Sequence, residues 1–317
     1  MIDKPMDVLR VFPVRKSKKQ KEAFRDAVSS YLRTIGYEPT VEKGSMGAKN
    51  LVIGNPETAE YLITAHYDTP ANMGMPNFVT PCSLIVFLLY QLLIVLVFLA
   101  AAVGIGVLAA LAFDDANLAS QICTLAYWIA LLLMMFGPAN QNNANDNTSG
   151  VVTVLEAAKS MPEAARGKVC FILFDLEEAG LIGSASYQKK HKKQTANQVI
   201  INLDCVGDGN EIVMFPTKKL RTDDARLEPL RGICGTWGEK SIALHEKGFS
   251  IYPSDQANFP LGVGVGAFHR KKWMGLYYSC IHTRKDTVLE ESNVNILRAA
   301  IVSLITCGAV NEKGKGI

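Results

Sequence analysis

Residues 131–159, LLLMMFGPANQNNANDNTSGVVTVLEAAK, join a run of apolar side chains to a polar turn that contains a single carboxylate, Asp146. Gly137 and Pro138 end the apolar run, which is typical of a buried or membrane-spanning helix. After the turn, the pattern predicts a second helix, and the polar residues 147–149 can cap it. An acid in this position is a candidate ligand whose partners must come from elsewhere in the chain.

Length and composition limit the possible classes of protein. The 317 residues are enough for one large α/β domain. Lys and Arg number 33 against 30 Asp and Glu, so the charge does not indicate a nucleic-acid partner. The seven cysteines occur singly, without a C-x-x-C pair, which predicts reduced thiols in a cytosolic setting. The N-terminal residues lack the order of a secretory signal.

One long segment of the chain carries no charge. No charged residue lies between Asp68 and Asp114, and a bilayer core needs about 20 apolar helical residues. An acidic turn then separates this run from a second one. We therefore expect a transmembrane hairpin over residues 82–137, with spans over about 84–113 and 118–136. A buried helix pair in a soluble core is the alternative, but a chain of this size would cover two such spans with difficulty.

A hairpin returns the chain to the side from which it entered, so residues 1–81 and 138–317 should form one domain on one side of the membrane. Basic runs at 15–21 and 189–193 stay with this domain, and the short acidic turn is easy to translocate. We expect an integral, multi-pass protein of the cell membrane that contacts lipids and has its domain in the cytoplasm.

Small residues four apart let membrane helices approach closely. Ala100 with Gly104, and Gly106 with Ala110, have this spacing, which predicts a homo-oligomer formed through the hairpin. A third apolar stretch, residues 296–310, is too short to span a bilayer and contains an arginine. It is expected to be an amphipathic helix that packs on a sheet.

Outside the hairpin, strand patterns alternate with helix patterns. Residues 59–68, 167–178 and 197–208 each begin with an apolar run of strand length and end in acids or a histidine. This alternation predicts an α/β fold with a mostly parallel central sheet covered by helices. In such folds the ligand site lies at the carboxyl ends of the strands.

Polar side chains fall at these strand ends and in two further turns. The candidates are His66, Asp68, Asp146, Glu177, Glu178, Asp204 and His282. Each of them alone could be a helix cap or a solvated surface group. Together, two imidazoles and several carboxylates suit zinc or a similar divalent cation.

Five motifs in order carry a resemblance to a known family. They are H-x-D at 66–68, N-D-N-x-S-G at 145–150, E-E-x-G-L-x-G-S at 177–184, N-x-D at 202–204 and H-T-x-x-D-T at 282–287. This set resembles family twenty-eight of the metallopeptidases (clan MH), the co-catalytic zinc aminopeptidases. The resemblance covers nearly all of the chain outside the hairpin, and it implies the zinc-exopeptidase fold.

The resemblance also implies a ligand set. Two zinc ions, which cobalt or manganese could replace, would be bridged by Asp146. His66 and Asp204 would complete one site, and Glu178 and His282 the other. The peptide bond that follows the bridging Asp is expected to be cis.

Two acids would act without binding metal. Asp68 would orient the imidazole of His66, and Glu177 would act as general base and then as general acid. The expected function is that of a membrane-embedded di-zinc aminopeptidase, which hydrolyses N-terminal residues from peptides.

Other functions stay open at this point. The family also contains carboxypeptidases, and some of its relatives are metal-free scaffolds or receptors, or single-zinc acyltransferases or cyclases. The hairpin lies between His66 and Asp146, where soluble members have only a short connection. This insertion predicts substrates that are apolar or membrane-derived.

Overall fold

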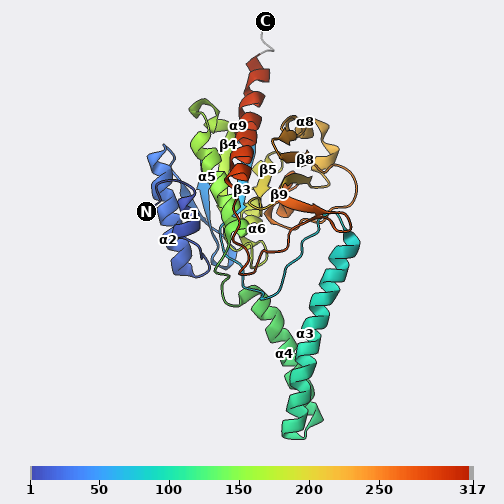
Figure 1. Ribbon diagram of the computed structural model, residues 1–317. Helices are drawn as coiled ribbons and strands as arrows, with labels where there is room; N and C mark the ends of the chain where they lie inside the picture. The colour runs from blue at the N-terminus through green and yellow to red at the C-terminus, as the bar shows by residue number, and fades with distance from the viewer. Residues whose placement is uncertain (1, 314–317) are drawn as a thin grey trace.

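The computed structural model describes residues 2–313 and shows a helix-covered sheet from which a long helical hairpin projects (Figure 1). Within the described residues, ten strands form a sheet in the order β1-β2-β4-β3-β5-β9-β6-β8-β7, with β10 paired to β9. The strands are β1 Thr40–Lys43, β2 Lys49–Ile53, β3 Tyr61–His66, β4 Val169–Phe174, β5 Val199–Leu203, β6 Glu211–Pro216, β7 Gly235–Trp237, β8 Lys240–Leu244, β9 Gly262–Lys271 and β10 Gly275–Tyr277.

The centre of the sheet is parallel. Strand β3 pairs in parallel with β4 and β5, and β5 pairs in parallel with β9. Ile63 is in register with Phe171 on one side and with Ile201 on the other. The outer pairs β1–β2, β2–β4, β6–β9, β7–β8 and β9–β10 are antiparallel, and β6–β8 is parallel. The predicted α/β class is confirmed, but the sheet is mixed, and its parallel part is formed by the strands that lead to the predicted ligands.

Helices bury both faces of this sheet. The α-helices of the described residues are α1 Asp7–Val11, α2 Lys18–Thr34, α3 Leu84–Phe113, α4 Ala116–Phe136, α5 Gly150–Ser160, α6 Ile182–Lys190, α7 Lys192–Thr195, α8 Asp224–Gly232 and α9 Glu291–Lys313. All of them except α3 and α4 belong to the domain that contains the sheet. Alternate side chains of a strand point to opposite faces. Thus Ile63 packs in the core formed with α2, α5 and α9, whereas Leu62 packs in a second core with Tyr187 of α6.

The predicted amphipathic helix over 296–310 is confirmed as part of α9, where Leu297 and Ile301 are buried in the first of these cores. This helix contacts α5, which begins directly after the turn that contains Asp146. The polar turn is therefore anchored by a helix that packs between β3 and α9.

Helices α3 and α4 form a hairpin that extends away from the domain (Figure 1). Asp114 adopts a left-handed conformation, with φ of 50°, and turns the chain. The side chain of Asp115 accepts hydrogen bonds from the backbone N–H groups of Asn117 and Leu118. Because this cap completes the first turn, α4 begins at Ala116, two residues before the predicted start.

Both hairpin helices are long and apolar enough to cross a membrane. Large apolar side chains on them face outward: Leu111 is 79% exposed and Ile85 is 73% exposed. The helices pack on each other at Gly106, where an added Cβ would lie 2.8 Å from Cys123 Cβ. Gly104 instead faces open space. Of the two predicted small-residue pairs, Gly106 is thus used within the chain and Gly104 is left for an outside contact.

The base of the hairpin is tied together. Asn72 N donates to Pro138 O at 2.8 Å, and Asn140 N donates to Pro70 O at 3.0 Å. The segments that enter and leave the hairpin therefore run side by side. The hairpin joins the domain at the edge of the sheet where β3 ends.

Candidate active site

All seven predicted site residues lie at the carboxyl edge of the central strands. His66 ends β3, the two glutamates follow β4, and Asp204 follows β5. Asp146 lies in the turn before α5, and His282 lies in the loop after β10. Six of them line a hollow of about 360 Å³, and Asp68 lies directly behind it.

The carboxylate of Asp146 lies between the two histidines. His66 Nε2 is 3.3 Å from Asp146 Oδ1 and 3.6 Å from Asp204 Oδ1. On the other side, His282 Nε2 is 2.9 Å from Asp146 Oδ2 and 3.5 Å from Glu178 Oε2. A tetrahedral zinc ion, with bonds of about 2.0–2.2 Å, keeps its ligand atoms roughly 3.3 Å apart. The spacing of these atoms fits a cation on each side of Asp146.

Unpaired polar atoms support the same fit. Asp146 Oδ1 and Glu178 Oε1 are buried, and neither has a hydrogen-bond partner among the described residues. Such an atom costs about 1–3 kcal/mol unless another group satisfies it. Burial and nearby carboxylates also raise the pKa of Glu177 and of Glu178 well above the usual value. Divalent cations would satisfy the oxygens and offset the crowded negative charge.

Asp68 has a second task that the sequence did not indicate. Its Oδ1 lies 3.5 Å from His66 Nδ1, a buried nitrogen that has no hydrogen-bond partner among the described residues. The same carboxylate accepts hydrogen bonds from Glu177 N at 3.0 Å and from Glu178 N at 3.2 Å. Asp68 therefore fixes the backbone of both glutamates as well as facing the imidazole.

Asp286 holds the backbone next to and at Asp146 and was missed as a site residue, although it lies in the quoted H-T-x-x-D-T motif. It accepts hydrogen bonds from Asn145 N at 2.7 Å and Asp146 N at 3.0 Å. Burial, followed by the charge of Asp146, raises the pKa of Asp286 to about 8. The bond between Asp146 and Asn147 is cis, as expected. Asn147 holds the turn by donating to Leu203 O at 2.9 Å.

The basic run at 15–21 lies partly inside the protein. Arg15 is fully buried and donates to Tyr67 O at 2.5 Å and to Thr148 Oγ1 at 3.1 Å. Burial lowers its pKa to about 10, against the opposing charges of Asp68 and Asp146. Lys21 pairs with Asp175 at 2.6 Å. These two cations lie inside the protein and bind residues close to the site. Their partners are distant in sequence, so the local sequence pattern does not indicate this role.

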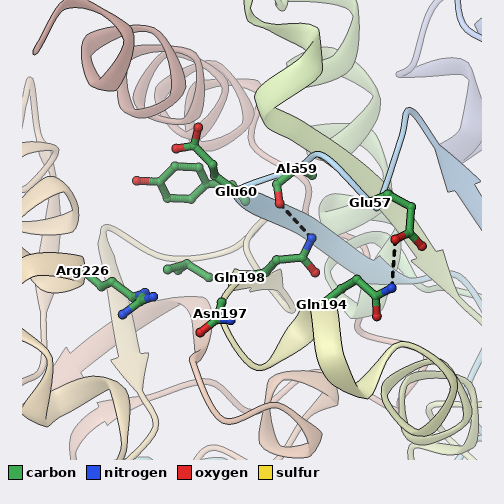
Figure 2. Close-up of a pocket in the computed structure, with 9 residues that line it drawn as sticks. Glu57, Ala59, Glu60, Gln194, Asn197, Gln198 and Arg226 are labelled. Atoms are coloured by element: carbon green, nitrogen blue, oxygen red, sulfur yellow. Dashed lines mark hydrogen bonds between the residues drawn. The ribbon is translucent and has the colours of Figure 1, made fainter. Parts of the chain in front are cut away.

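A second hollow, of about 390 Å³, lies at the opposite edge of the sheet, where β3 and β5 begin. Figure 2 shows that the Gln198 amide donates to Ala59 O and that Gln194 donates to Glu57, at 2.8 and 2.9 Å. None of its lining residues is a histidine or a cysteine. Of these two hollows, the one at the carboxyl edge combines histidines with carboxylates.

Comparisons with known proteins identify a family and similar folds. The model of peptidase family M28 matches residues 133–304. The structure of the LapA aminopeptidase from Legionella pneumophila is similar, with a TM-score of 0.57 and 14% identity over 96% of this chain and 68% of that one. The structure of LapB from the same organism has a TM-score of 0.53 and 13% identity over 95% of this chain and 70% of that one. The structure of a glutaminyl cyclase from Macrostomum lignano has a TM-score of 0.51 and 13% identity over 97% of this chain and 89% of that one. No curated protein matches the sequence.

The family match and the structural matches cover different parts of the site. The region matched by the family model includes Asp146, both glutamates, Asp204 and His282 but begins after His66. The structural matches extend over the whole domain, and at these identities they show the fold alone.

Proposed function

The chain belongs to peptidase family M28, and from that premise we propose that it is a di-zinc aminopeptidase that removes N-terminal residues from peptides. The observation that carries the proposal is the position of Asp146. One of its oxygens faces His66 and the other faces His282, and each histidine also lies near a further carboxylate.

In this proposal His66, Asp204 and one oxygen of Asp146 would hold one zinc ion. Glu178, His282 and the other oxygen of Asp146 would hold the second, and cobalt or manganese could replace either. Two ions bound here would supply a water of lowered pKa and polarise the scissile carbonyl group.

Glu177 is the proton carrier. It lines the hollow, and its backbone is fixed by Asp68. Burial raises its pKa well above the usual value of a carboxyl group, which suits a group that must accept a proton and release it again. Glu177 takes a proton from the attacking water and then gives it to the leaving amine.

The charge of the hollow favours an aminopeptidase over a carboxypeptidase. None of its lining residues is a lysine or an arginine that could bind a C-terminal carboxylate. The carboxylates Glu177, Glu178 and Asp204 are instead suited to a free α-amino group. Binding of the α-amino group by these carboxylates would place the first residue of the peptide at the metal ligands.

We further propose that residues 82–137 anchor the protein in a membrane and that residues 1–81 and 138–317 form the catalytic domain. The outward-facing apolar side chains of α3 and α4 support this anchor. The outward-facing Gly104, with Ala100 four residues before it, would bring two copies of the chain together.

Cations near the hairpin base support a cytoplasmic domain. Lys16 Nζ donates to Met135 O at the end of α4, at 3.3 Å. Exposed Arg284 and Lys285 line a hollow of about 570 Å³ together with Pro76, whose carbonyl accepts a hydrogen bond from Tyr90 of α3. These cations are distant from the spans in sequence but lie beside them in space. Positive charge at this level favours the cytoplasmic side.

Hydrolysis by the purified protein in detergent tests the proposed function. We expect zinc-dependent release of the first residue from free peptides and none from N-blocked peptides. Glu177→Gln should keep its zinc and lose at least about 100-fold in kcat, whereas Glu163→Gln, at an exposed acid, should match the wild type. Equal cleavage of blocked peptides would contradict the proposal. Cyclisation of an N-terminal glutamine without peptide cleavage would assign a cyclase instead.

A further inference from the structure

The hollow that contains the metal ligands has an apolar wall formed in part by the hairpin. Val79, Met135 and Ile281 line it together with the acids. Met135 belongs to the last turn of α4, and Val79 belongs to the segment that leads into α3. The hairpin therefore reaches the site itself and is not joined to the domain only by flexible connections.

Hydrogen bonds hold this wall in a fixed position relative to the metal ligands. Val79 N donates to Tyr278 O at 3.0 Å, and Tyr278 N donates back to Val79 O at 3.2 Å. Met73 N donates to His282 O at 2.8 Å. Lys16 holds the end of α4 through Met135 O. The loop that carries His282 and the base of the hairpin thus form one bonded unit.

The hollow is lined both by acids and by the apolar wall, and its lining contains no lysine or arginine. A substrate whose free amine binds at the acids would have the side chain of its first residue in the same hollow as the wall. An apolar side chain gains by burial against the wall, whereas an acidic one would lose its hydration and lie near the other acids.

The apolar surface also continues beyond the wall. Leu132, Leu133 and Phe136, the neighbours of Met135 on α4, are 55%, 53% and 59% exposed. In a membrane these side chains would contact lipid, so the pocket would open beside the bilayer surface. Peptides with an apolar end concentrate at that surface.

We propose that Met135, with Val79 and Ile281, binds the side chain of the substrate's first residue, so that the hairpin selects peptides that begin with a large apolar residue. This proposal rests on the aminopeptidase function proposed above. It makes Met135 a specificity-determining residue supplied by the membrane anchor.

Substitutions at neighbouring methionines test it in the full-length, zinc-loaded protein. For wild type, Met135→Ala and Met134→Ala, kcat/KM is measured with leucyl and alanyl reporter peptides. Met135→Ala should lower the leucine-to-alanine ratio roughly 10-fold, because a shortened apolar contact discriminates less well. Met134 lies on the same turn but does not line the hollow, so its variant should keep the wild-type ratio. Equal ratios in all three proteins would overturn the proposal.

A binding measurement separates failure of this proposal from failure of the proposed function. In Met135→Cys and Met134→Cys variants, alkylation of the new thiol is followed by mass spectrometry with and without a leucyl or glutamyl peptide. The leucyl peptide should protect position 135 alone, and the glutamyl peptide should protect neither position. If no reporter is cleaved, the proposed aminopeptidase function is wrong. The protection assay still shows whether an apolar first residue binds next to position 135. Equal protection by both peptides would overturn the proposal.

Discussion

The sheet domain and the α3–α4 hairpin place apolar side chains in opposite ways. In the domain, Leu62, Ile63 and Phe171 are fully buried between sheet and helices. In the hairpin, Leu111 and Leu108 are 79% and 68% exposed. Apolar composition is high in both regions, so composition alone does not distinguish a core from a membrane surface. The difference teaches that the domain buries its apolar surface within the chain, whereas the hairpin needs apolar surroundings from outside.

Of the changes considered, removal of the hairpin should have the largest effect, because it removes the exposed apolar surface and leaves the buried core of the domain. When a short Gly-Ser linker replaces residues 84–136, the protein should move from the membrane fraction to the soluble fraction. The domain should stay folded and bind zinc, because the flanking segments are already joined through Asn72 and Asn140. Fractionation, circular dichroism and metal analysis check this. A full-length protein that is soluble and monodisperse without detergent would contradict the membrane assignment.

Truncating one leucine in each region compares the two kinds of surface directly. Leu173→Ala, in the domain core, should lower the free energy of unfolding by about 2–5 kcal/mol because it leaves a cavity. Leu108→Ala, on the outward side of α3, should change it by less than about 0.5 kcal/mol in detergent. Denaturant unfolding in one detergent measures both. A larger effect at Leu108 would show that this surface is packed in the assembled protein.

The pH dependence of stability should come from the domain, because neither hairpin helix contains an acid, a base or a histidine. In the metal-free protein, burial raises the pKa of Glu178, and it raises that of Asp286 to about 8. Unfolded carboxyl groups have a pKa of about 4. The folded form then binds more protons than the unfolded form, so its stability should fall as the pH rises from about 4 to 8.

Zinc competes with protons for the acids of the site, so the stability of the zinc-loaded protein should rise with pH. Melting temperatures of chelator-treated and zinc-loaded protein, measured between pH 5 and pH 8, check the expected fall in the first and the expected rise in the second. A metal-free protein that becomes more stable with rising pH would show that the acids are not held protonated in the folded state.

Two glycines of α3 should differ in the sign of their effect on stability. Gly106→Ala should destabilise the hairpin by about 1–3 kcal/mol, because its Cβ would meet Cys123 at 2.8 Å. Gly104→Ala has open space around it and should be neutral or stabilise the helix by up to about 1 kcal/mol. Thermal unfolding in detergent separates the two signs. If Gly104→Ala also weakens self-association, Gly104 lies in the contact between copies.

Local patterns were sufficient to predict which polar side chains gather at one edge of the sheet. His66 ends β3, Glu177 lies in the loop after β4 and Asp204 directly follows β5, and parallel strands bring their carboxyl ends to one edge. The helix signals likewise predicted α3 to its observed ends. Asp286 and Arg15 could not be assigned in this way. They act on Asn145, Asp146 and Thr148 across more than 100 residues, and their own surroundings in the sequence resemble an ordinary polar turn and a surface basic run.

The second role of Asp68 was hidden for a related reason. Its bonds to Glu177 and Glu178 go to backbone N–H groups, which every residue other than proline has. A sequence pattern can indicate which side chains suit a metal. It does not indicate which backbone groups the fold brings within reach of a carboxylate.

The zinc content of the full-length protein in lipid tests the account most directly, because every step of the proposed chemistry depends on two ions around Asp146. Plasma mass spectrometry measures it in the wild type, in His282→Ala and in His269→Ala, a control at a half-buried histidine that does not line the hollow. We predict about two zinc ions per chain in the wild type and the control, and about one in His282→Ala. One ion or none in the wild type would contradict the central claim that Asp146 bridges two metal sites at the exit of the hairpin.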